Sequence, residues 1–197
     1  MSKTVEFYFD VGSPTSYLAY TQLQKICSET SATLSFRPIL LGGVFKATGN
    51  ASPNDVPAKA RYSVVDLDRF ARRYGVPLNF NPHFPINTLN LMRALTAVQA
   101  RQPERFIAFL ELTFKAMWVD RLNLNDPAVL VETLKSGGFD PAEIFAWVND
   151  PKIKEQLKRD TEAAVTRGIF GAPSMFVDDQ LYFGQDRVDF VREALSS

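Results

Sequence analysis

Residues 4–10, TVEFYFD, are followed almost at once by Gly12, Ser13 and Pro14, and this junction constrains the fold more than any other part of the sequence. The segment is rich in aromatic and β-branched residues, which is typical of a buried strand. A serine followed by a proline predicts a helix start, with the hydroxyl at the N-cap and proline in the first turn. The chain is therefore expected to open with a strand that ends directly at a helix N-terminus.

The helix after this junction is expected to turn one face to the core. Small and apolar side chains recur there at a spacing of three and four residues. They are Ser16, Ala19, Tyr20, Leu23, Ile26 and Cys27. A second strand is expected at residues 34–37, because Leu34 and Phe36 alternate with polar residues. A β-α-β opening implies a parallel strand pair with a right-handed crossover.

The middle of the chain predicts helices and no strands. Residues 40–58 contain several glycines and prolines and are expected to form a long loop. Beyond that loop apolar residues recur at helical spacing, and Asp-Pro pairs mark helix starts. The expected helices cover residues 59–75, 87–101, 103–119, 127–136 and 141–149. The 103–119 segment is apolar on almost every side, so we expect it to be buried.

The C-terminal part returns to strands. Asp150-Pro151 opens a helix that ends near Gly168, and FGAPSMFVDDQLYFG at residues 170–184 predicts a hairpin. A short helix is expected from Asp186. The order is then β-α-β, a helical insertion and α-β-β-α. We therefore predict an α/β, thioredoxin-like fold with a large all-helical insertion.

Two segments from the ends of the chain are expected to form one domain. Residues 1–58 and 150–197 make the predicted thioredoxin-like domain, and residues 59–149 make the insertion. No linker or low-complexity stretch separates them, so we expect the insertion to pack on the core as one unit.

The composition excludes several classes of protein. Of the 197 residues 46% are hydrophobic, which allows a sizeable core, and 22 Lys and Arg balance 22 Asp and Glu. A chain without net charge offers no basic field for phosphates, so we expect no nucleic-acid partner. No apolar run approaches the roughly 20 residues that a membrane helix needs, so no membrane partner is expected either. The N-terminal segment, with Glu6 and Asp10, is too short and too charged for a signal peptide.

The sequence has one cysteine, Cys27, and one histidine, His83. A lone cysteine forms neither an internal disulfide nor a CxxC pair, which fits a reducing compartment, and we expect the cytoplasm. Cys27 lies on the apolar stripe and is expected to be a buried packing residue. A Ser-His-Asp triad would have to use His83, and a metal site would need several further ligands, so we predict neither.

Ser13 stands where a strand ends and a helix begins, a position suited to an anionic ligand. The helix dipole, the unpaired N–H groups of the first turn and the carboxyl ends of the strands all favour negative charge there. A thiolate would be stabilised, and the Ser13 hydroxyl could donate a charge-assisted hydrogen bond to it. Taken alone, the motif favours an ordinary N-cap, which contributes about 1 kcal/mol of stability.

Two motifs near the C-terminus leave similar alternatives open. Pro173 precedes a strand, where proline predicts a turn or a cis bond or is simply a loop residue. A cis bond would leave the carbonyl and N–H groups of Ala172 free to pair with an extended peptide. Asp186 could cap the last helix, hold an ammonium group of a ligand, or do both with different oxygens.

Seven short motifs, taken together, resemble one family. They are SPxSYL from Ser13, TGNxxP from Thr48, PxKxxYxxxDLxR from Pro57, YGVPL from Tyr74, MRAL from Met92, FGAP from Phe170 and FGxDR from Phe183. In this order and spacing, over nearly the whole chain, they resemble the 2-hydroxychromene-2-carboxylate isomerases and kappa-class glutathione transferases. That family has a thioredoxin fold with a helical insertion and is related to periplasmic disulfide oxidoreductases.

The resemblance implies that glutathione is the cofactor and that the thioredoxin-like domain binds it. Ser13 would hydrogen-bond the glutathione sulfur as the catalytic residue. The Ala172 backbone would pair with the cysteinyl group, with Pro173 cis. Gln185 and Asp186 would grip the γ-glutamyl end.

Further contacts follow from the same resemblance. Asn50 would touch the ligand from the loop after the second strand, and Lys59 would lie near its glycyl end. Pro14 and Thr15 would flank the sulfur beside the serine. The family usually has an aromatic residue at the position of Thr15, so the shape of the second-substrate pocket differs here.

The resemblance also implies a reaction. A glutathione thiolate would add to a small, aromatic, carboxylate-bearing electrophile and then leave, giving a cis–trans isomerisation in aromatic catabolism. Lys46, Lys59 and Arg93 are all open candidates for holding the substrate carboxylate. The family likeness also suggests a homodimer.

Three alternatives to the isomerase stay open. A kappa-class-like transferase shares the first step but leaves the conjugate formed. A disulfide oxidoreductase or redox sensor would need a thiol in the turn, where residues 13 and 16 are both serine. A non-catalytic binding module on the thioredoxin scaffold is the third.

Overall fold

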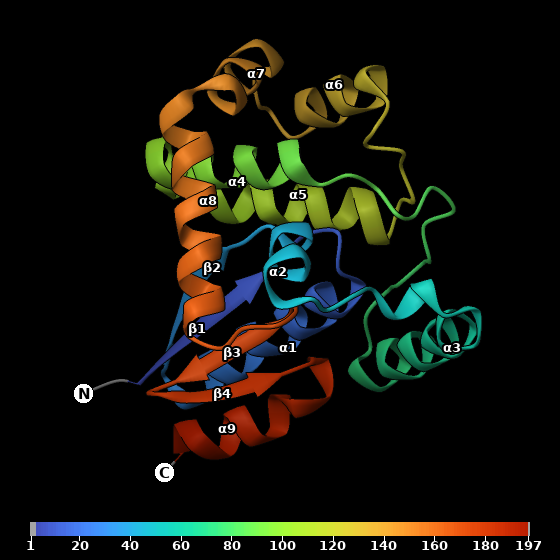
Figure 1. The fold of residues 1–197 in the computed structure, drawn as a ribbon, viewed down its shortest axis with the longest axis vertical. Coiled ribbons are helices and arrows are strands. Elements are labelled where there is room, and N and C mark those ends of the chain that lie inside the picture. The colour runs from blue at the N-terminus through green and yellow to red at the C-terminus, as the bar shows by residue number, and fades with distance from the viewer. Residues whose placement is uncertain (1–2, 197) are drawn as a thin grey trace.

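The computed structural model describes residues 3–196, and within this range it contains a four-stranded sheet. The strands are β1 (Thr4–Phe9), β2 (Thr33–Pro38), β3 (Ser174–Val177) and β4 (Gln180–Phe183). Their order is β2-β1-β3-β4, with β1 and β2 parallel and the β1–β3 and β3–β4 pairs antiparallel. This sheet, shown in Figure 1, confirms the predicted thioredoxin-like topology with its helical insertion.

Helices surround the sheet and fill the interval between β2 and β3. Those packed around the sheet include α1 (Pro14–Thr30), α2 (Leu41–Thr48), α8 (Pro151–Thr166) and α9 (Val188–Ser196). The interval between α2 and α8 holds α3 (Pro57–Tyr74), α4 (Leu89–Arg101), α5 (Phe106–Trp118), α6 (Pro127–Ser136) and α7 (Pro141–Asn149). Short 3-10 turns are η1 (Pro53–Asp55), η2 (Pro103–Arg105) and η3 (Gln185–Arg187). Each predicted helix is present, with its ends shifted by a few residues.

The junction between β1 and α1 forms as the sequence predicts. Ser13 is the N-cap of α1, its side chain accepts a hydrogen bond from the Ser16 N–H, and Pro14 occupies the first turn. The predicted core-facing stripe is buried along its whole length. The helix ends at Ser31, whose left-handed φ of 56° stops the chain before β2.

The prediction of a continuous loop at residues 40–58 is wrong, because the structure has α2 in this interval. Two distant side chains hold its first turn: Asp10 Oδ2 accepts the Leu41 N–H at 2.8 Å, and Thr161 Oγ1 accepts the Leu40 N–H at 3.0 Å. Gly43 allows a close approach to α8, since a Cβ there would lie 3.2 Å from Thr161 Cγ2. Tertiary contacts thus outweigh the low helix propensity of the glycines.

The sheet separates two clusters of buried side chains. Alternate residues of β1 point to opposite faces, so Phe7 and Phe9 join the larger cluster and Tyr8 joins the smaller one. The larger cluster continues through α1 into α4 and α5. The smaller one lies under α2 and α8 and includes Val44 and Phe176.

The insertion shares its packing with the sheet domain. Trp118 at the end of α5 is fully buried and donates its indole N–H to the Val11 carbonyl at 2.7 Å. Phe114 contacts the rings of Tyr17 and Tyr20 on α1. In Figure 1, α4 and α5 lie above the sheet and α3 stands to the right of it. The strongly apolar α5 is therefore buried, as its sequence predicts.

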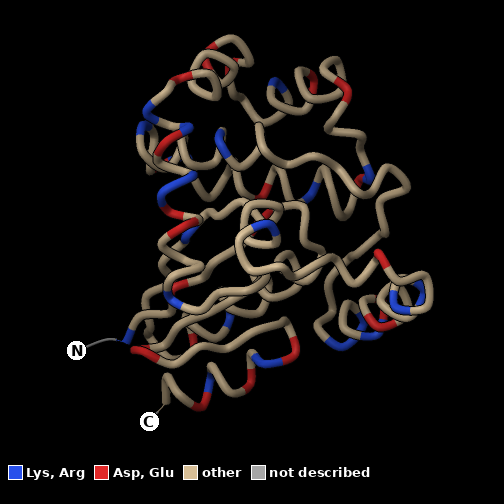
Figure 2. Tube along the Cα trace, viewed as in Figure 1, with Lys and Arg blue, Asp and Glu red and all other residues tan. Residues whose placement is uncertain are grey.

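The surface carries charges of both signs. Figure 2 shows Lys and Arg interspersed with Asp and Glu along the helices. Within residues 3–196, no helix combines the length and the apolar character that a membrane span requires. In the same range, no group of three or more His, Cys, Asp and Glu side chains is placed to hold a metal ion.

Candidate active site

A cleft of about 310 Å³ opens at the carboxyl end of β1. Its walls come from the start of α1, from α2 and α3, and from the segments on either side of the β3–β4 hairpin. Most of the predicted site residues line it: Ser13, Pro14, Thr15, Asn50, Ala172, Gln185 and Asp186. Segments from the N-terminal and C-terminal parts of the chain and from the helical insertion therefore meet at this cleft.

The Ser13 hydroxyl lies at the wall of this cleft and is sheltered from bulk water. The residue is only 4% exposed. Its Oγ accepts the Ser16 N–H at 3.1 Å. The hydroxyl also has one hydrogen of its own to donate. That hydrogen can go to the Ala172 carbonyl at 3.0 Å or to the Thr15 hydroxyl at 2.8 Å. A ligand atom placed at this wall would compete for the same hydrogen.

A buried carboxylate supports the turn from below. Asp10, 1% exposed, accepts hydrogen bonds from the Gly12 and Leu41 N–H groups, both at 2.8 Å, and from the Thr88 hydroxyl at 3.1 Å. Burial raises the pKa of this carboxyl, although the three hydrogen bonds oppose the rise. Asp10 thereby ties the turn before α1 to the first turn of α2, and so fixes two walls of the cleft.

The segment before β3 has the cis Ala172–Pro173 bond that was one of the open alternatives. Two hydrogen bonds fix the backbone on either side of this bond. Ser174 Oγ donates to the Gly171 carbonyl at 2.8 Å, and the Gly184 N–H donates to the Pro173 carbonyl at 3.0 Å. The expectation that the Ala172 carbonyl is free is wrong, since it accepts hydrogen bonds from the Ser13 and Thr15 hydroxyls. Pro173 is buried and does not line the cleft.

Gln185 and Asp186 enter the cleft on the 3-10 turn η3, which precedes α9. Gly184 has a φ of 98°, and a Cβ there would lie 2.5 Å from Asp186 Oδ1, so glycine is required. The Asp186 carboxylate pairs with Arg187 at 2.7 Å and does not cap α9. The Tyr74 hydroxyl donates to the Gln185 carbonyl at 2.6 Å, which ties the end of α3 to η3.

The two remaining predicted contacts differ in placement. Asn50 lies at the cleft, where its Nδ2 donates to the Phe170 carbonyl at 2.8 Å and its Oδ1 accepts the Ala51 N–H. Lys59 is exposed in the first turn of α3 and is not among the residues that line the cleft. The structure thus brings Asn50, but not Lys59, to Ser13.

Several lining residues were not predicted. Tyr62 and Asp66 face the cleft one turn apart on α3, with the Tyr62 hydroxyl 3.4 Å from Asp66 Oδ1. Their i, i+4 spacing within the α3 motif could have indicated a shared face. Phe45, Phe80 and Phe84 add aromatic walls that only the folded chain assembles. The charged residues of the lining are Asp66 and Asp186.

The reactive side chains elsewhere do not enter this site. Cys27 is 6% exposed on α1, and burial raises its pKa to about 11, as expected of a packing residue. His83 lies in an exposed turn and does not line the cleft. Lys46 and Arg93 line a different cleft on the far side of α2. None of the three cations considered for a substrate carboxylate therefore lies at Ser13.

The candidate site of this thioredoxin-fold protein is a sheltered serine hydroxyl that lies between a helix N-terminus and a cis-proline segment. Comparison with known proteins gives the family. Residues 4–196 match the family model described as DSBA-like thioredoxin domain. The chain belongs to this family, within the group that contains the 2-hydroxychromene-2-carboxylate isomerases and the kappa-class glutathione transferases.

Relatives in this group match over nearly their full length. The 2-hydroxychromene-2-carboxylate isomerase of Sphingobium xenophagum is 34% identical, covering 99% of each chain. Human glutathione S-transferase kappa 1 is 30% identical over 99% of this chain and 92% of its own. A solved structure of 2-hydroxychromene-2-carboxylate isomerase superposes with a TM-score of 0.86 at 29% identity, covering 98% of this chain and 94% of the other.

Proposed function

We propose that this protein is a glutathione-dependent isomerase of the 2-hydroxychromene-2-carboxylate type, with Ser13 as the residue that holds the reacting sulfur. One observation carries the proposal: the Ser13 hydroxyl lies at the N-terminus of α1, within a cleft and 3.0 Å from the Ala172 carbonyl. The full-length similarity to proteins named as such isomerases supports it.

The lining of the cleft fits a γ-glutamyl tripeptide at two of its three parts. An extended peptide can pair with the Ala172 carbonyl once the Ser13 hydroxyl donates to the ligand instead, because one of the two lone pairs of that oxygen is then free and a backbone edge can accept an added strand. An ammonium group would face the Asp186 and Asp66 carboxylates. The glycyl carboxylate finds no Lys or Arg in the lining, so we assign it to the open side of the cleft, toward Lys59 on α3.

Bound glutathione would supply the nucleophilic sulfur that the turn itself lacks. Ser13 would donate its hydrogen to that sulfur, while Thr15 Oγ1, 3.3 Å from the Ala172 oxygen, keeps a hydrogen bond on the carbonyl. The positive end of the α1 dipole favours an ionised sulfur over a neutral one. A thiol pKa lowered by one unit corresponds to about 1.4 kcal/mol, which a charge-assisted hydrogen bond can supply.

The aromatic walls fit a flat second substrate. Phe80 and Phe84 line the cleft, and Tyr62 adds a further ring from α3. Aromatic rings favour offset or edge-on contacts with an aromatic guest. Thr15 leaves more room than an aromatic residue would at the same position. The carboxylate of such a substrate would be oriented away from Asp66, toward the mouth of the cleft.

A transferase is the second candidate, supported by the similarity to human glutathione S-transferase kappa 1. Both reactions need the same sulfur at Ser13 and differ in whether it leaves the product. A disulfide oxidoreductase is disfavoured, because Cys27 is buried and burial raises its pKa to about 11.

The test is a glutathione titration of the wild type and the Ser13→Ala variant at neutral pH. Calorimetry measures binding, and ultraviolet absorbance measures the amount of thiolate. We expect both proteins to bind, with the thiolate absorbance largely lost in the variant. Ser16→Ala is the control, since Ser16 lies on the same turn but does not line the cleft. Equal thiolate absorbance in Ser13→Ala and the wild type would contradict the role of Ser13.

Product analysis separates the two reactions. With 2-hydroxychromene-2-carboxylate, formation of trans-hydroxybenzylidenepyruvate supports the isomerase. With an aryl halide, a stable thioether supports the transferase. Binding without turnover on either substrate would favour a non-catalytic binding module.

A further inference from the structure

A second cleft, of about 700 Å³, lies on the opposite face of α2 from Ser13. It is bounded by α2, by the first half of α4 and by α8. Leu41 and Phe45 of α2 face the Ser13 cleft, whereas Gly43 and Lys46 face this one. The two clefts have no lining residue in common, so α2 is a wall between them.

Positive charge in this second cleft exceeds negative charge. Its lining includes the cations Lys46, Arg93, Lys154 and Lys158 and the carboxylates Glu155 and Glu162, which leaves a formal charge of +2. Lys158 lies 3.9 Å from Glu155. Figure 2 shows basic positions along α2 and α8, the two helices that face each other across the cleft.

Three of these cations have no partner in the described part of the chain. The side chains of Lys46, Arg93 and Lys154 make no hydrogen bond and no ion pair with residues 3–196. Arg93 is partly buried and lies on the α4 wall of the cleft. A guanidinium has five N–H donors in a planar fork, which match the two oxygens of a carboxylate.

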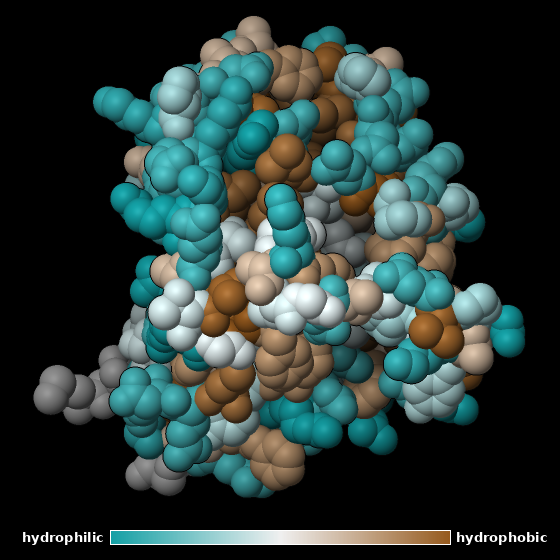
Figure 3. All heavy atoms as spheres, viewed as in Figure 1, coloured by the Kyte–Doolittle hydropathy of each residue, from teal (hydrophilic) through white to brown (hydrophobic). Residues whose placement is uncertain are grey.

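The remainder of the lining is apolar. Leu40, Leu89, Leu157 and Val165 contribute aliphatic surface. The one hydroxyl, on Thr161, is already engaged, because it donates to the Leu157 carbonyl and accepts the Leu40 N–H. Figure 3 shows hydrophobic residues between α8 and α2, bordered by hydrophilic residues along α8. Such a lining suits an anion that also carries an apolar body.

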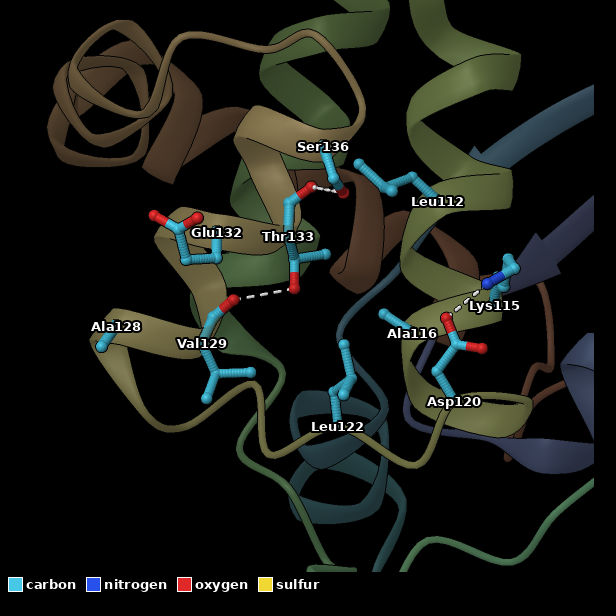
Figure 4. Close-up of a pocket in the computed structure, with 10 residues that line it drawn as sticks. All are labelled: Leu112, Lys115, Ala116, Asp120, Leu122, Ala128, Val129, Glu132, Thr133 and Ser136. Carbon is cyan, nitrogen blue, oxygen red and sulfur yellow. Dashed lines mark hydrogen bonds and ion pairs between the residues drawn. The ribbon is translucent and has the colours of Figure 1, made fainter.

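The hollow between α5 and α6 in Figure 4 offers a contrast. It measures about 510 Å³, but its polar groups are satisfied. Lys115 pairs with Asp120, and the hydroxyls of Thr133 and Ser136 donate to carbonyls of their own helix. Unpartnered cations distinguish the cleft behind α2 from this hollow.

We propose that the cleft behind α2 binds a small organic acid with an apolar body. The Arg93 guanidinium would take the carboxylate through two parallel hydrogen bonds, a geometry to which its planar fork is suited. Lys46 and Lys154, from the other two walls, add positive charge. The apolar body packs on Leu89 and Leu157. The proposal does not depend on glutathione binding at Ser13.

Helix α2 is a shared wall of this cleft and the Ser13 cleft. The N–H groups of Leu40 and Leu41 are held by Thr161 on one side and by Asp10 on the other. An acid bound against α2 therefore touches a helix whose other face lines the Ser13 site.

Calorimetric titration with cinnamate, its neutral amide and inorganic phosphate tests the proposal. We expect cinnamate to bind and the amide and phosphate to bind much more weakly. Arg93→Gln should weaken cinnamate binding by about tenfold or more, which corresponds to about 1.4 kcal/mol. Lys152→Gln is the matched control, because Lys152 lies on α8 outside the cleft, and should leave binding unchanged.

Two further arms keep the result unambiguous. Arg93→Lys keeps the charge but loses the fork, so we expect an affinity between those of the wild type and Arg93→Gln. Saturating glutathione and Ser13→Ala should leave the Arg93-dependent binding in place. Cinnamate binding that is indifferent to Arg93, or phosphate binding as tight as cinnamate binding, would overturn the assignment.

Discussion

The hydroxyl oxygen of Ser13 lies 3.0 Å from the carbonyl oxygen of Ala172, although the two residues are 159 positions apart in the chain. Ser13 caps the first helix and Ala172 precedes the third strand, so the hydrogen bond joins the two halves of the thioredoxin-like domain. The same hydrogen is the one that a ligand at the cleft wall would receive. The Ser13 hydroxyl therefore serves both the stability of the folded domain and the binding of a ligand.

Two serines one turn apart should respond differently to alanine. Ser13→Ala removes the N-cap and the bond to Ala172, so the free energy of unfolding should fall by about 1–2 kcal/mol. Ser16 Oγ is fully buried and has no hydrogen-bond partner within residues 3–196, so Ser16→Ala should be neutral or stabilising. Urea unfolding of both variants measures the difference. A larger loss for Ser16→Ala would mean that its hydroxyl has a partner.

Gly184→Ala should damage the site beyond its cost in stability. The new Cβ would lie 2.5 Å from Asp186 Oδ1 and displace that carboxylate, and the φ of 98° adds strain. Gly75→Ala is the matched control, because Gly75 has a φ of 65° with open space around it. Both variants should lose about 1–2 kcal/mol of stability, but only Gly184→Ala should lose glutathione affinity. Equal affinities in calorimetry would remove Asp186 from the binding site.

Cys27 should react slowly at neutral pH. Burial raises its pKa to about 11, so the thiol is protonated below that pH and the thiolate is scarce. Alkylation by iodoacetamide, followed by mass spectrometry, should be slow at neutral pH and accelerate as the pH rises. The Ser13→Cys variant in a Cys27→Ala background should react much faster, because its thiol would stand at a helix N-terminus. Rapid alkylation of Cys27 in the folded wild type would reopen the redox alternative.

Acid should selectively weaken the pair between Glu6 and Arg167, which lie 3.0 Å apart. Burial tends to raise the pKa of Glu6, but Arg167, together with Tyr8 and Arg37, outweighs it and holds the pKa below its ordinary value. The pair therefore stabilises the fold above the unfolded pKa, about 4.3. That contribution is lost as the pH falls through the lower folded value. Arg167→Gln and Glu6→Gln should each lower the free energy of unfolding relative to the wild type at neutral pH. Both losses should shrink in acid, as measured by urea unfolding across pH.

Elements with a local signal could be predicted from the sequence. The helices that begin at Pro127, Pro141 and Pro151 each follow an aspartate whose side chain accepts the N–H two residues later. These interactions lie within a few residues, so the sequence contains all of their determinants. The same is true of Ser13 at the start of α1.

Elements set by distant partners could not be predicted in this way. Helix α2 depends on Asp10 and Thr161, which precede and follow it by many residues, and its own glycines favour a loop. Lys59 lies on the expected helix, but its distance from the cleft depends on how α3 packs. The unpartnered charge of Arg93 is likewise visible only once the neighbouring helices are in place.

One wall of the Ser13 cleft, helix α3, comes from the interval between β2 and β3, whereas the hydroxyl and the Ala172 carbonyl come from segments on either side of that interval. The two parts of the pocket are therefore encoded by different segments of the chain. Substitutions confined to α3 can change which molecules the cleft admits without changing the residues around Ser13. A scaffold divided in this manner can diversify its chemistry without rebuilding its reactive centre.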